Sequence, residues 1–261
     1  MAEVSDVFTI EARPAPVRFD ASETAVIVVD MENDFGSPEG MFGRAGIDLT
    51  GIRATIEPTR RVLASARRKG IRIVYLKMAF RPDLSDAGAP DAPNWLKHLP
   101  MHAGEGVTAP DGSPSRVLVR DTWNTEILPE LTPEPGDVVV YKHRFSGFFE
   151  TELDATLKDW GIRNLVFTGC TTSVCVESTI KDAMFRDYHC LLIEDCTAEA
   201  IGAGLPRSNH DATVLVIQTL VGWVSDSASW LAALDHPAAK RADNRALQAT
   251  YPTSAFGPRT C

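Results

Sequence analysis

The feature that most constrains the fold is a regular alternation of short apolar runs with segments of helical periodicity. The first run, TAVIVV at 24–29, is rich in β-branched residues, which is typical of a parallel strand covered on both faces. Further strands are predicted at 71–76, 137–141, 164–168, 189–193 and near 223–224, with helices at 51–69, 123–131, 150–160, 173–186, 209–220 and 227–234. Strands that alternate with helices predict an α/β fold, namely a three-layer, doubly wound, mostly parallel sheet.

The same alternation predicts the domain organisation. No linker, internal repeat or low-complexity tract interrupts it, so we expect one α/β domain over residues 23–235. Residues 1–22 hold few apolar side chains and are predicted to form an extended arm, either an oligomer contact or a frayed terminus. The polar segment 236–261 is predicted to be a loose or partner-bound tail. The stretch 78–121 is rich in Pro, Gly and Asp and lacks periodicity, and a loop of this length is usually functional.

The charge balance and the cysteine count narrow the range of partners and locations. Acidic residues outnumber basic ones 35 to 26, whereas nucleic acids and anionic membrane surfaces bind clustered Lys and Arg, so we expect neither as the main partner. No apolar run reaches the ~18–20 residues that span a bilayer, and the acidic start lacks the hydrophobic core of a signal peptide. Five clustered cysteines in a chain of this length do not form a disulfide framework, so we expect a reducing, cytoplasmic location.

Three reactive side chains stand at the carboxyl ends of predicted parallel strands, where ligands bind in open α/β sheets. Asp30 ends the first strand, Lys142 ends the third, and Cys175 lies in the first turn of the helix after the fourth. A helix N-terminus and a nearby ammonium group lower the pKa of a thiol, and a carboxylate can carry its proton to a leaving amine. Each residue alone has a structural explanation, but their convergence at one sheet edge favours a cysteine nucleophile.

The sequence offers little support for a metal or an organic cofactor. Cys170 and Cys175 are five residues apart, which does not fit a CxxC redox pair or a zinc knuckle. His98 and His102 have helical i, i+4 spacing, but no third ligand lies nearby in the chain. There is no GxGxxG after a strand and no P-loop. We therefore expect no metal and no cofactor.

Three motifs resemble those of the isochorismatase-like cysteine hydrolases. VVDMENDF at 28–35 resembles the family's D-M-Q-N-D-F, with Glu32 in place of Gln. YKHRFSGFF at 141–149 resembles its lysine motif K-x-x-x-S-x-F, and TGCTTSVCV at 168–176 resembles its nucleophile loop G-x-x-T-[ND]-x-C-V, with Ser173 at the Asn/Asp position. The motifs occur in family order, and the similarity extends over roughly residues 20–235.

Within this family the chain most resembles the ureidoacrylate amidohydrolases of pyrimidine degradation. The stretches that carry this similarity are 144–149, 161–169, 174–179 and 222–226. The family also contains hydrolases of biuret, N-carbamoylsarcosine and nicotinamide. Nicotinamidases place an Asp and two His after the second strand to bind a metal, whereas KMAFRPD at 77–83 has no His, so a nicotinamidase is not expected. The chain departs from the ureidoacrylate pattern at Met78 and Phe80, where those enzymes carry Asn and Trp.

The resemblance implies roles for individual residues. It implies a catalytic triad of Asp30, Lys142 and Cys175, and a cis peptide bond between Cys170 and Thr171. It also implies an oxyanion hole formed by the backbone N–H groups of Thr171 and Cys175. Charge and position suggest further substrate contacts, each with a structural alternative: Phe35, Phe80, Arg81, Phe145, Phe148 and Gln218, with Lys77 and Trp95 considered beside them.

The predicted function is that of a cysteine-dependent amidohydrolase. It cleaves a C–N bond of a small linear ureido or carbamoyl compound, such as ureidoacrylate or biuret, through an acyl-thioester, and releases carbamate or ammonia. Two alternatives stay open. One is vinyl-ether hydrolysis of isochorismate, which in this family does not need the cysteine, and the other is a non-catalytic homologue that acts as a binding module. We expect a small-molecule substrate and a homo-oligomer, either a dimer or a tetramer.

Overall fold

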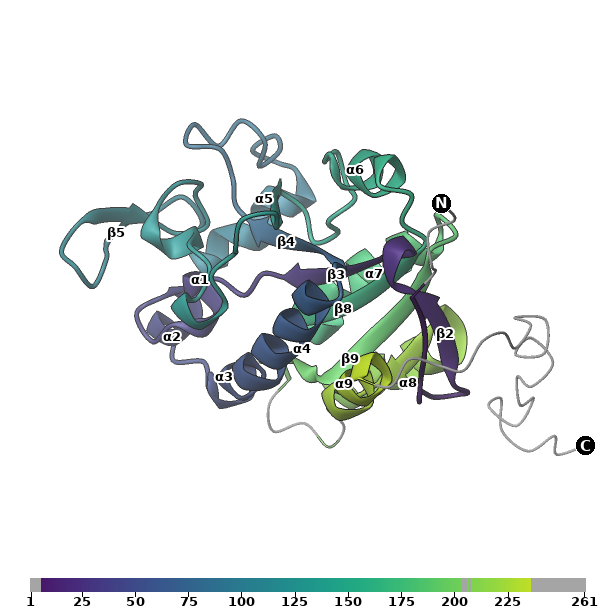
Figure 1. The fold of residues 1–261 in the computed structure, drawn as a ribbon. Coiled ribbons are helices and arrows are strands. Elements are labelled where there is room, and N and C mark those ends of the chain that lie inside the picture. The colour runs from purple at the N-terminus through teal and green to yellow at the C-terminus, as the bar shows by residue number, and fades with distance from the viewer. Residues whose placement is uncertain (1–5, 203–205, 207, 236–261) are drawn as a thin grey trace, which may run out of the picture.

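The protein is built around a six-stranded sheet in which every pair of neighbouring strands is parallel (Figure 1). The computed structural model describes residues 6–202, 206 and 208–235. The strand order is β10-β9-β8-β3-β4-β7. The strands are β3 (Thr24–Val29), β4 (Arg72–Met78), β7 (Val138–Lys142), β8 (Asn164–Cys170), β9 (His189–Ala198) and β10 (Trp223–Ser225). This confirms the predicted α/β fold with a doubly wound parallel sheet.

Helices cover both faces of the sheet, because successive side chains of each buried strand point to opposite sides. Val26 and Val28 of β3 belong to one hydrophobic cluster, whereas Ala25, Ile27 and Val29 belong to the other. The first face is covered by α4 (Ile56–Arg68) and α9 (Ser227–Asp235), and the second by α6 (Leu153–Asp159), α7 (Glu177–Met184) and α8 (Asn209–Val216). The uninterrupted apolar run of β3 is therefore buried along its whole length.

The part of the N-terminal segment that the structure describes is not a loose arm. It forms an antiparallel hairpin of β1 (Val7–Ile10) and β2 (Val17–Asp20), followed by the 3-10 turn η1 (Ala21–Glu23). Phe8 and Phe19 are buried, and the Phe8 ring packs edge-on against Trp230 of α9 with 5.5 Å between centroids. A frayed terminus therefore does not describe residues 7–20, whose two short strands with period-two apolar residues carry a weak sequence signal, and an oligomer contact stays a prediction. Residues 1–5 and the predicted tail 236–261 lie outside the described residues.

The long segment between β4 and β7 contains short elements of its own. They are α5 (Pro93–His98), η2 (Leu99–Met101), β5 (Gly106–Thr108), β6 (Pro114–Arg116), η3 (Trp123–Thr125) and η4 (Pro129–Leu131). The single helix predicted at 123–131 is therefore wrong, since two 3-10 turns flank an extended stretch. Pro129 explains the break, because proline disfavours helical backbone in the residue before it, and Leu128 is extended there with ψ 134°.

The remaining short elements lie in the connections between the strands of the sheet. After β3 the chain forms α1 (Asn33–Gly36), α2 (Met41–Arg44) and α3 (Thr50–Ala54), so the helix predicted at 51–69 is divided into α3 and α4. Two π-helical turns, η5 (Thr172–Val176) and η6 (Ile217–Val221), precede α7 and follow α8. In the described part of the chain, no helix is both long and apolar enough to cross a membrane.

Candidate active site

Asp30 and Lys142 form an ion pair at the carboxyl edge of the sheet. Asp30 follows β3 and has a φ of 50°, while Lys142 ends β7, two strands away across β4. The Lys142 Nζ lies 2.7 Å from Asp30 Oδ2, and neither side chain exposes more than 1% of its surface. The same ammonium group donates a hydrogen bond to the Arg144 carbonyl at 3.3 Å. Because a buried charge needs an opposite charge and hydrogen bonds, this pair depends on both strand ends being in register.

Cys175 completes the group of three residues that the sequence pointed to. The chain leaves β8 at Cys170 and enters η5, which places the nearly buried Cys175 one turn before α7. Its thiol is close enough to both the Asp30 carboxylate and the Lys142 ammonium group for their charges to shift its pKa. The structure therefore brings an acid, an amine and a thiol into one buried cluster.

Burial dominates the electrostatics of this cluster. Burial raises the pKa of the Cys175 thiol, Lys142 acts to lower it, and the Asp30 charge adds to the rise. The expectation of a lowered thiol pKa is therefore wrong, because the loss of hydration outweighs the ammonium group and the helix end. Burial also raises the pKa of Asp30 against the opposing effect of Lys142. Burial acts to lower the pKa of Lys142, but the charges of Asp30 and Cys175 raise it above its ordinary value.

The nucleophile loop is held by hydrogen bonds on both sides. The peptide bond between Cys170 and Thr171 is cis, and the Cys170 Sγ donates to the Asp30 carbonyl at 3.2 Å. Ser173 donates its backbone N–H to Glu199 Oε2 at 2.7 Å, and its hydroxyl bonds the same oxygen. Glu199 was not singled out in the sequence, because it follows β9 and only the fold brings it beside the loop.

The residues predicted to contact substrate do not all lie in the same environment. Phe80 and Phe145 both pack on the His98 ring, at 5.3 and 5.4 Å between centroids. The Arg81 side chain is 61% exposed and lies 3.9 Å from Asp86, so the structure places it on a surface carboxylate and not beside the buried pair.

Three other predicted contacts, and the two residues considered beside them, have packing neighbours of their own. Phe35 packs edge-on against Phe42 with 5.0 Å between centroids. Phe148 shares a hydrophobic cluster with Cys175, but its ring packs against Tyr188 at 6.0 Å. Gln218 lies in η6 and is partly exposed. Trp95 packs on Phe80, and the Lys77 ammonium group lies 5.1 Å from the centre of the Tyr141 ring.

Two acidic residues of the first motif have site roles that sequence reasoning missed. Asp34 accepts hydrogen bonds from the backbone N–H groups of Met41 and Leu118 at 2.9 and 2.7 Å, and from Asn124 Nδ2 at 2.5 Å. The bonds from Leu118 and Asn124 connect the long β4–β7 segment to the residues that follow β3. Burial raises the pKa of the Asp34 carboxyl to about 6. Glu32 is fully buried, yet both its carboxyl oxygens lack a hydrogen-bond partner among the described residues. The only sequence signal was its departure from the Gln of the motif.

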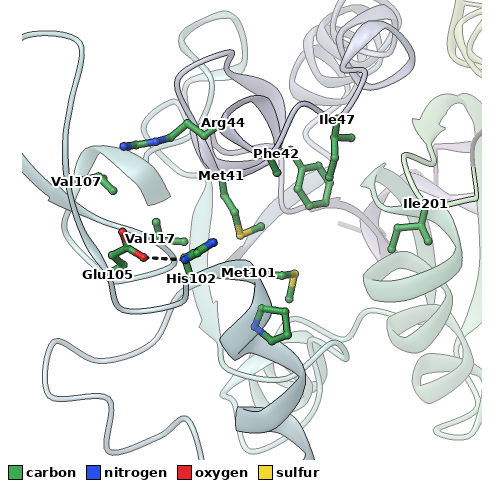
Figure 2. Close-up of a pocket in the computed structure, with 12 residues that line it drawn as sticks. Met41, Phe42, Arg44, Ile47, Met101, His102, Glu105, Val107, Val117 and Ile201 are labelled. Carbon is green, nitrogen blue, oxygen red and sulfur yellow. Dashed lines mark hydrogen bonds and ion pairs between the residues drawn. The ribbon is translucent and has the colours of Figure 1, made fainter.

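A separate cavity of about 500 Å³ opens between α2, the segment around residues 100–117 and Ile201 (Figure 2). Its walls are mainly apolar, with Met41, Phe42 and Met101 pointing into it. At one side His102 Nδ1 and Glu105 Oε2 are 2.8 Å apart. None of the three clustered catalytic candidates lines this cavity.

The histidines of the described residues do not gather as metal ligands. His98 is buried, and its Nδ1 lies 2.6 Å from the Asn94 carbonyl, to which it donates. His102 faces Glu105 instead, so the i, i+4 pair does not converge. Over residues 6–202, 206 and 208–235, no group of three or more His, Cys, Asp and Glu side chains has an arrangement that could hold a metal ion.

Comparison with known proteins places this fold and cluster in a family. The isochorismatase domain model matches residues 24–229. The chain is 41% identical over 233 residues to ureidoacrylate amidohydrolase RutB of Methylorubrum extorquens strain AM1, which covers 89% of this chain and 91% of the relative.

Two solved structures resemble most of this fold. A cysteine hydrolase from Pseudomonas syringae pv. phaseolicola 1448A has a TM-score of 0.69 and 25% identity, and the match covers 83% of this chain and 94% of that one. N-carbamoylsarcosine amidase from Thermoplasma acidophilum has a TM-score of 0.58 and 26% identity, with coverage of 78% and 96%. The resemblance of the three sequence motifs is thus confirmed over most of the chain, and the protein belongs to the isochorismatase family.

Proposed function

We propose that this protein is a cysteine-dependent amidohydrolase that cleaves a C–N bond of a small linear ureido or carbamoyl compound, with ureidoacrylate as the first candidate. The observation that carries the proposal is the buried Asp30–Lys142 ion pair at the carboxyl edge of the sheet, with the buried Cys175 thiol near enough to interact electrostatically with both groups. The 41% identity to a ureidoacrylate amidohydrolase over 233 residues supports the substrate class. Met78 and Phe80, where the chain departs from that pattern, leave biuret-like compounds as the next candidates.

In the first half of the reaction Asp30 accepts the Cys175 proton as the sulfur attacks the substrate carbonyl. A raised thiol pKa keeps Cys175 protonated at rest, so the nucleophile is made by proton transfer during attack. A raised Asp30 pKa makes the carboxylate a stronger base for this step. The tetrahedral intermediate collapses to an acyl-thioester when Asp30 returns the proton to the leaving nitrogen. The C–N bond breaks and an amine or ammonia departs.

In the second half water replaces the amine. Asp30 accepts a proton from a water molecule, whose oxygen attacks the thioester carbonyl, and the C–S bond breaks as the proton returns to Cys175. A carbamate product then decomposes to CO2 and ammonia. All these steps use groups of the chain itself, and Lys142, 2.7 Å from Asp30, stabilises the negative charge that moves between carboxylate and sulfur.

The oxyanion of both tetrahedral intermediates is assigned to the backbone N–H groups of Thr171 and Cys175. Thr171 directly precedes η5, Cys175 lies within it, and both residues are buried. Fixed backbone donors in a water-excluded site stabilise developing charge without reorganisation. The hydrogen bonds of Ser173 to Glu199 hold the loop between them in place.

The test of this function is a panel of ureidoacrylate, biuret, triuret and N-carbamoyl amino acids, assayed for ammonia release by the wild type and by Cys175→Ala. We expect at least one compound to be hydrolysed by the wild type and none by the variant, with unchanged circular dichroism. Cys175→Ser provides a matched control that keeps a hydroxyl nucleophile. Ammonia release that survives in Cys175→Ala would contradict the covalent mechanism.

The same panel separates the two alternatives. Isochorismate consumption that survives loss of Cys175 would favour vinyl-ether hydrolysis. A protein that binds ureides but turns none over, with a Cys175 that does not react with iodoacetamide at any pH, would favour a binding module. A homo-oligomer, dimer or tetramer, remains our expectation and is tested by light scattering at several concentrations.

A further inference from the structure

Glu32 combines two properties that rarely occur together. Its side chain is completely buried, and neither carboxyl oxygen has a hydrogen-bond partner among the described residues. Glu32 precedes α1 but makes no side-chain capping bond to that helix. An unpaired buried polar group costs about 1–3 kcal/mol, so such groups call for an explanation at a functional site.

The surroundings of Glu32 are those of the candidate active site. Its charge interacts with Asp30 and Lys142 of the catalytic cluster, and with the Cys170 thiol at the end of β8. The other charged or titratable groups that face it are Asp34 on α1, Lys77 on β4 and Tyr141 on β7. The groups that interact with Glu32 therefore come from the ends of β3, β4, β7 and β8 and from α1, at the carboxyl edge of the sheet.

Asp34, two residues away, is a carboxylate whose hydrogen-bonding capacity is satisfied by donors of the protein. It accepts three hydrogen bonds, from two backbone N–H groups and the Asn124 amide, which are the partners of an ionised group. Asp30 has the Lys142 ammonium group at 2.7 Å. Glu32 stands between these two acids in the sequence and has no hydrogen-bond donor in the part of the chain that the structure describes, and the charges of both acids oppose its ionisation.

We propose that Glu32 is a specificity-determining residue that binds the substrate's carbamoyl group as a neutral carboxyl, an inference that rests on the proposed function. A neutral carboxyl presents one O–H donor and one C=O acceptor side by side. A carbamoyl group presents the complementary C=O acceptor and N–H donor, so the two form a pair of parallel hydrogen bonds. A substrate without an N–H beside its carbonyl, such as an ester, would leave the Glu32 acceptor unpaired.

The Gln of the family motif fits the same pattern. A side-chain amide also presents one acceptor and N–H donors, so a neutral Glu is the closest acidic equivalent of Gln in size and bonding. Burial, followed by the charges of Asp30 and Asp34, raises the pKa of Glu32 well above its ordinary value. The change from Gln to Glu therefore keeps the hydrogen-bond pattern at neutral pH. Unlike Gln, the Glu32 carboxyl loses its O–H donor when it is deprotonated at high pH.

The first test compares the pH dependence of KM in the wild type, Glu32→Gln and the control Glu126→Gln from about pH 6 to about pH 10. Glu126 is exposed, so the same chemical change there alters a solvated side chain, although its backbone carbonyl accepts a hydrogen bond from Asn33 N. For wild type and control, KM should rise about tenfold per pH unit above the Glu32 titration, since only the neutral fraction binds. For Glu32→Gln, KM should stay flat, with a neutral-pH value within about threefold of the wild type.

Two outcomes of this test would overturn the inference. A KM for Glu32→Gln that rises in parallel with the wild type would assign the titration to another group. A loss of binding of about a hundredfold or more in a folded Glu32→Gln at neutral pH would mean that an ionised carboxylate is required. Since Asp30 and Cys175 are intact in all three proteins, any change of kcat with pH should be common to them.

A second measurement needs no activity and so separates this inference from the proposed function. The infrared difference spectrum between wild type and Glu32→Gln at neutral pH should contain the C=O band of a neutral carboxyl, which Glu126→Gln retains. Absence of that band would overturn the inference even if ureides are hydrolysed. Presence of the band in a protein that hydrolyses no ureide would instead reject the proposed function and leave the neutral state of Glu32 established.

Discussion

The two ends of β7 each carry an ion pair, and the pairs differ in how much water reaches them. Before the strand starts, Asp137 lies 2.5 Å from Arg67 of α4, whose side chain is 22% exposed and also contacts Glu134. At the end of the strand, Lys142 Nζ lies 2.7 Å from Asp30 Oδ2, and both side chains are buried. A partly exposed pair contributes little to stability, whereas a sealed pair is costly to break and has strongly shifted proton affinities. The same strand thus carries a partly exposed ion pair at one end and a candidate catalytic pair at the other.

The largest effect is expected from Asp30→Asn. Both proton transfers of the proposed mechanism pass through this carboxyl group, so kcat should fall by about 10⁴. The equivalent change at the other end of β7, Asp137→Asn, should leave kcat within about twofold. Steady-state ammonia release by both variants provides the measurement. A fall of less than tenfold for Asp30→Asn would point to a different base.

The next effect concerns stability and compares the two cations directly. Lys142→Met leaves Asp30 buried without its partner and should lower the free energy of unfolding by about 3–5 kcal/mol. Arg67→Met removes a partly exposed pair and should cost about 1 kcal/mol. Urea denaturation of both variants checks the difference. Equal losses would mean that burial does not distinguish the two pairs.

A smaller effect is expected from the pH dependence of stability. A folded pKa of Glu32 raised well above its unfolded value means that the native state binds more protons between those two values. The contribution of neutral Glu32 to the free energy of unfolding is therefore fully present below the unfolded pKa of about 4.3. It is lost as the pH rises through the pKa of the folded state. Glu32→Gln should be more stable than the wild type at pH 8 by about 1–2 kcal/mol, with the difference shrinking towards pH 4. Thermal melts at several pH values measure it, and a variant less stable at pH 8 would contradict it.

The smallest effect is expected at Arg81, which the sequence suggested as a substrate contact. Its guanidinium is mostly exposed and lies 3.9 Å from Asp86, so Arg81→Gln should change the free energy of unfolding by less than about 0.5 kcal/mol. KM for the best ureide should change by less than about twofold. A tenfold rise in KM would instead identify Arg81 as a substrate contact and show that an exposed side chain contributes to substrate binding.

Much of the candidate site could be predicted because its residues follow predicted strands. In a parallel sheet the carboxyl ends lie at one edge, so Asp30, Lys142 and Cys175 were expected to meet before any distance was known. The hairpin at 7–20 could not be predicted as readily, because each strand is four residues long and buries only alternate side chains. The apolar spacing over 123–131 is typical of a helix, but Pro129 within it interrupts the helical backbone.

The sequence by itself determined the strand-helix alternation, the three family motifs and the identity of the reactive groups. Only the tertiary structure decided their protonation, because proton affinity depends on burial and on neighbours from other strands. The position of Cys175 at a helix start near an ammonium group predicts a lowered thiol pKa, yet burial raises the pKa of Cys175. Likewise Asp34 and Glu32 stand two residues apart in one motif, but only Asp34 receives donors from the long β4–β7 segment. The sequence specifies which residue types are present. The tertiary structure determines how exposed each one is to solvent and which groups lie beside it.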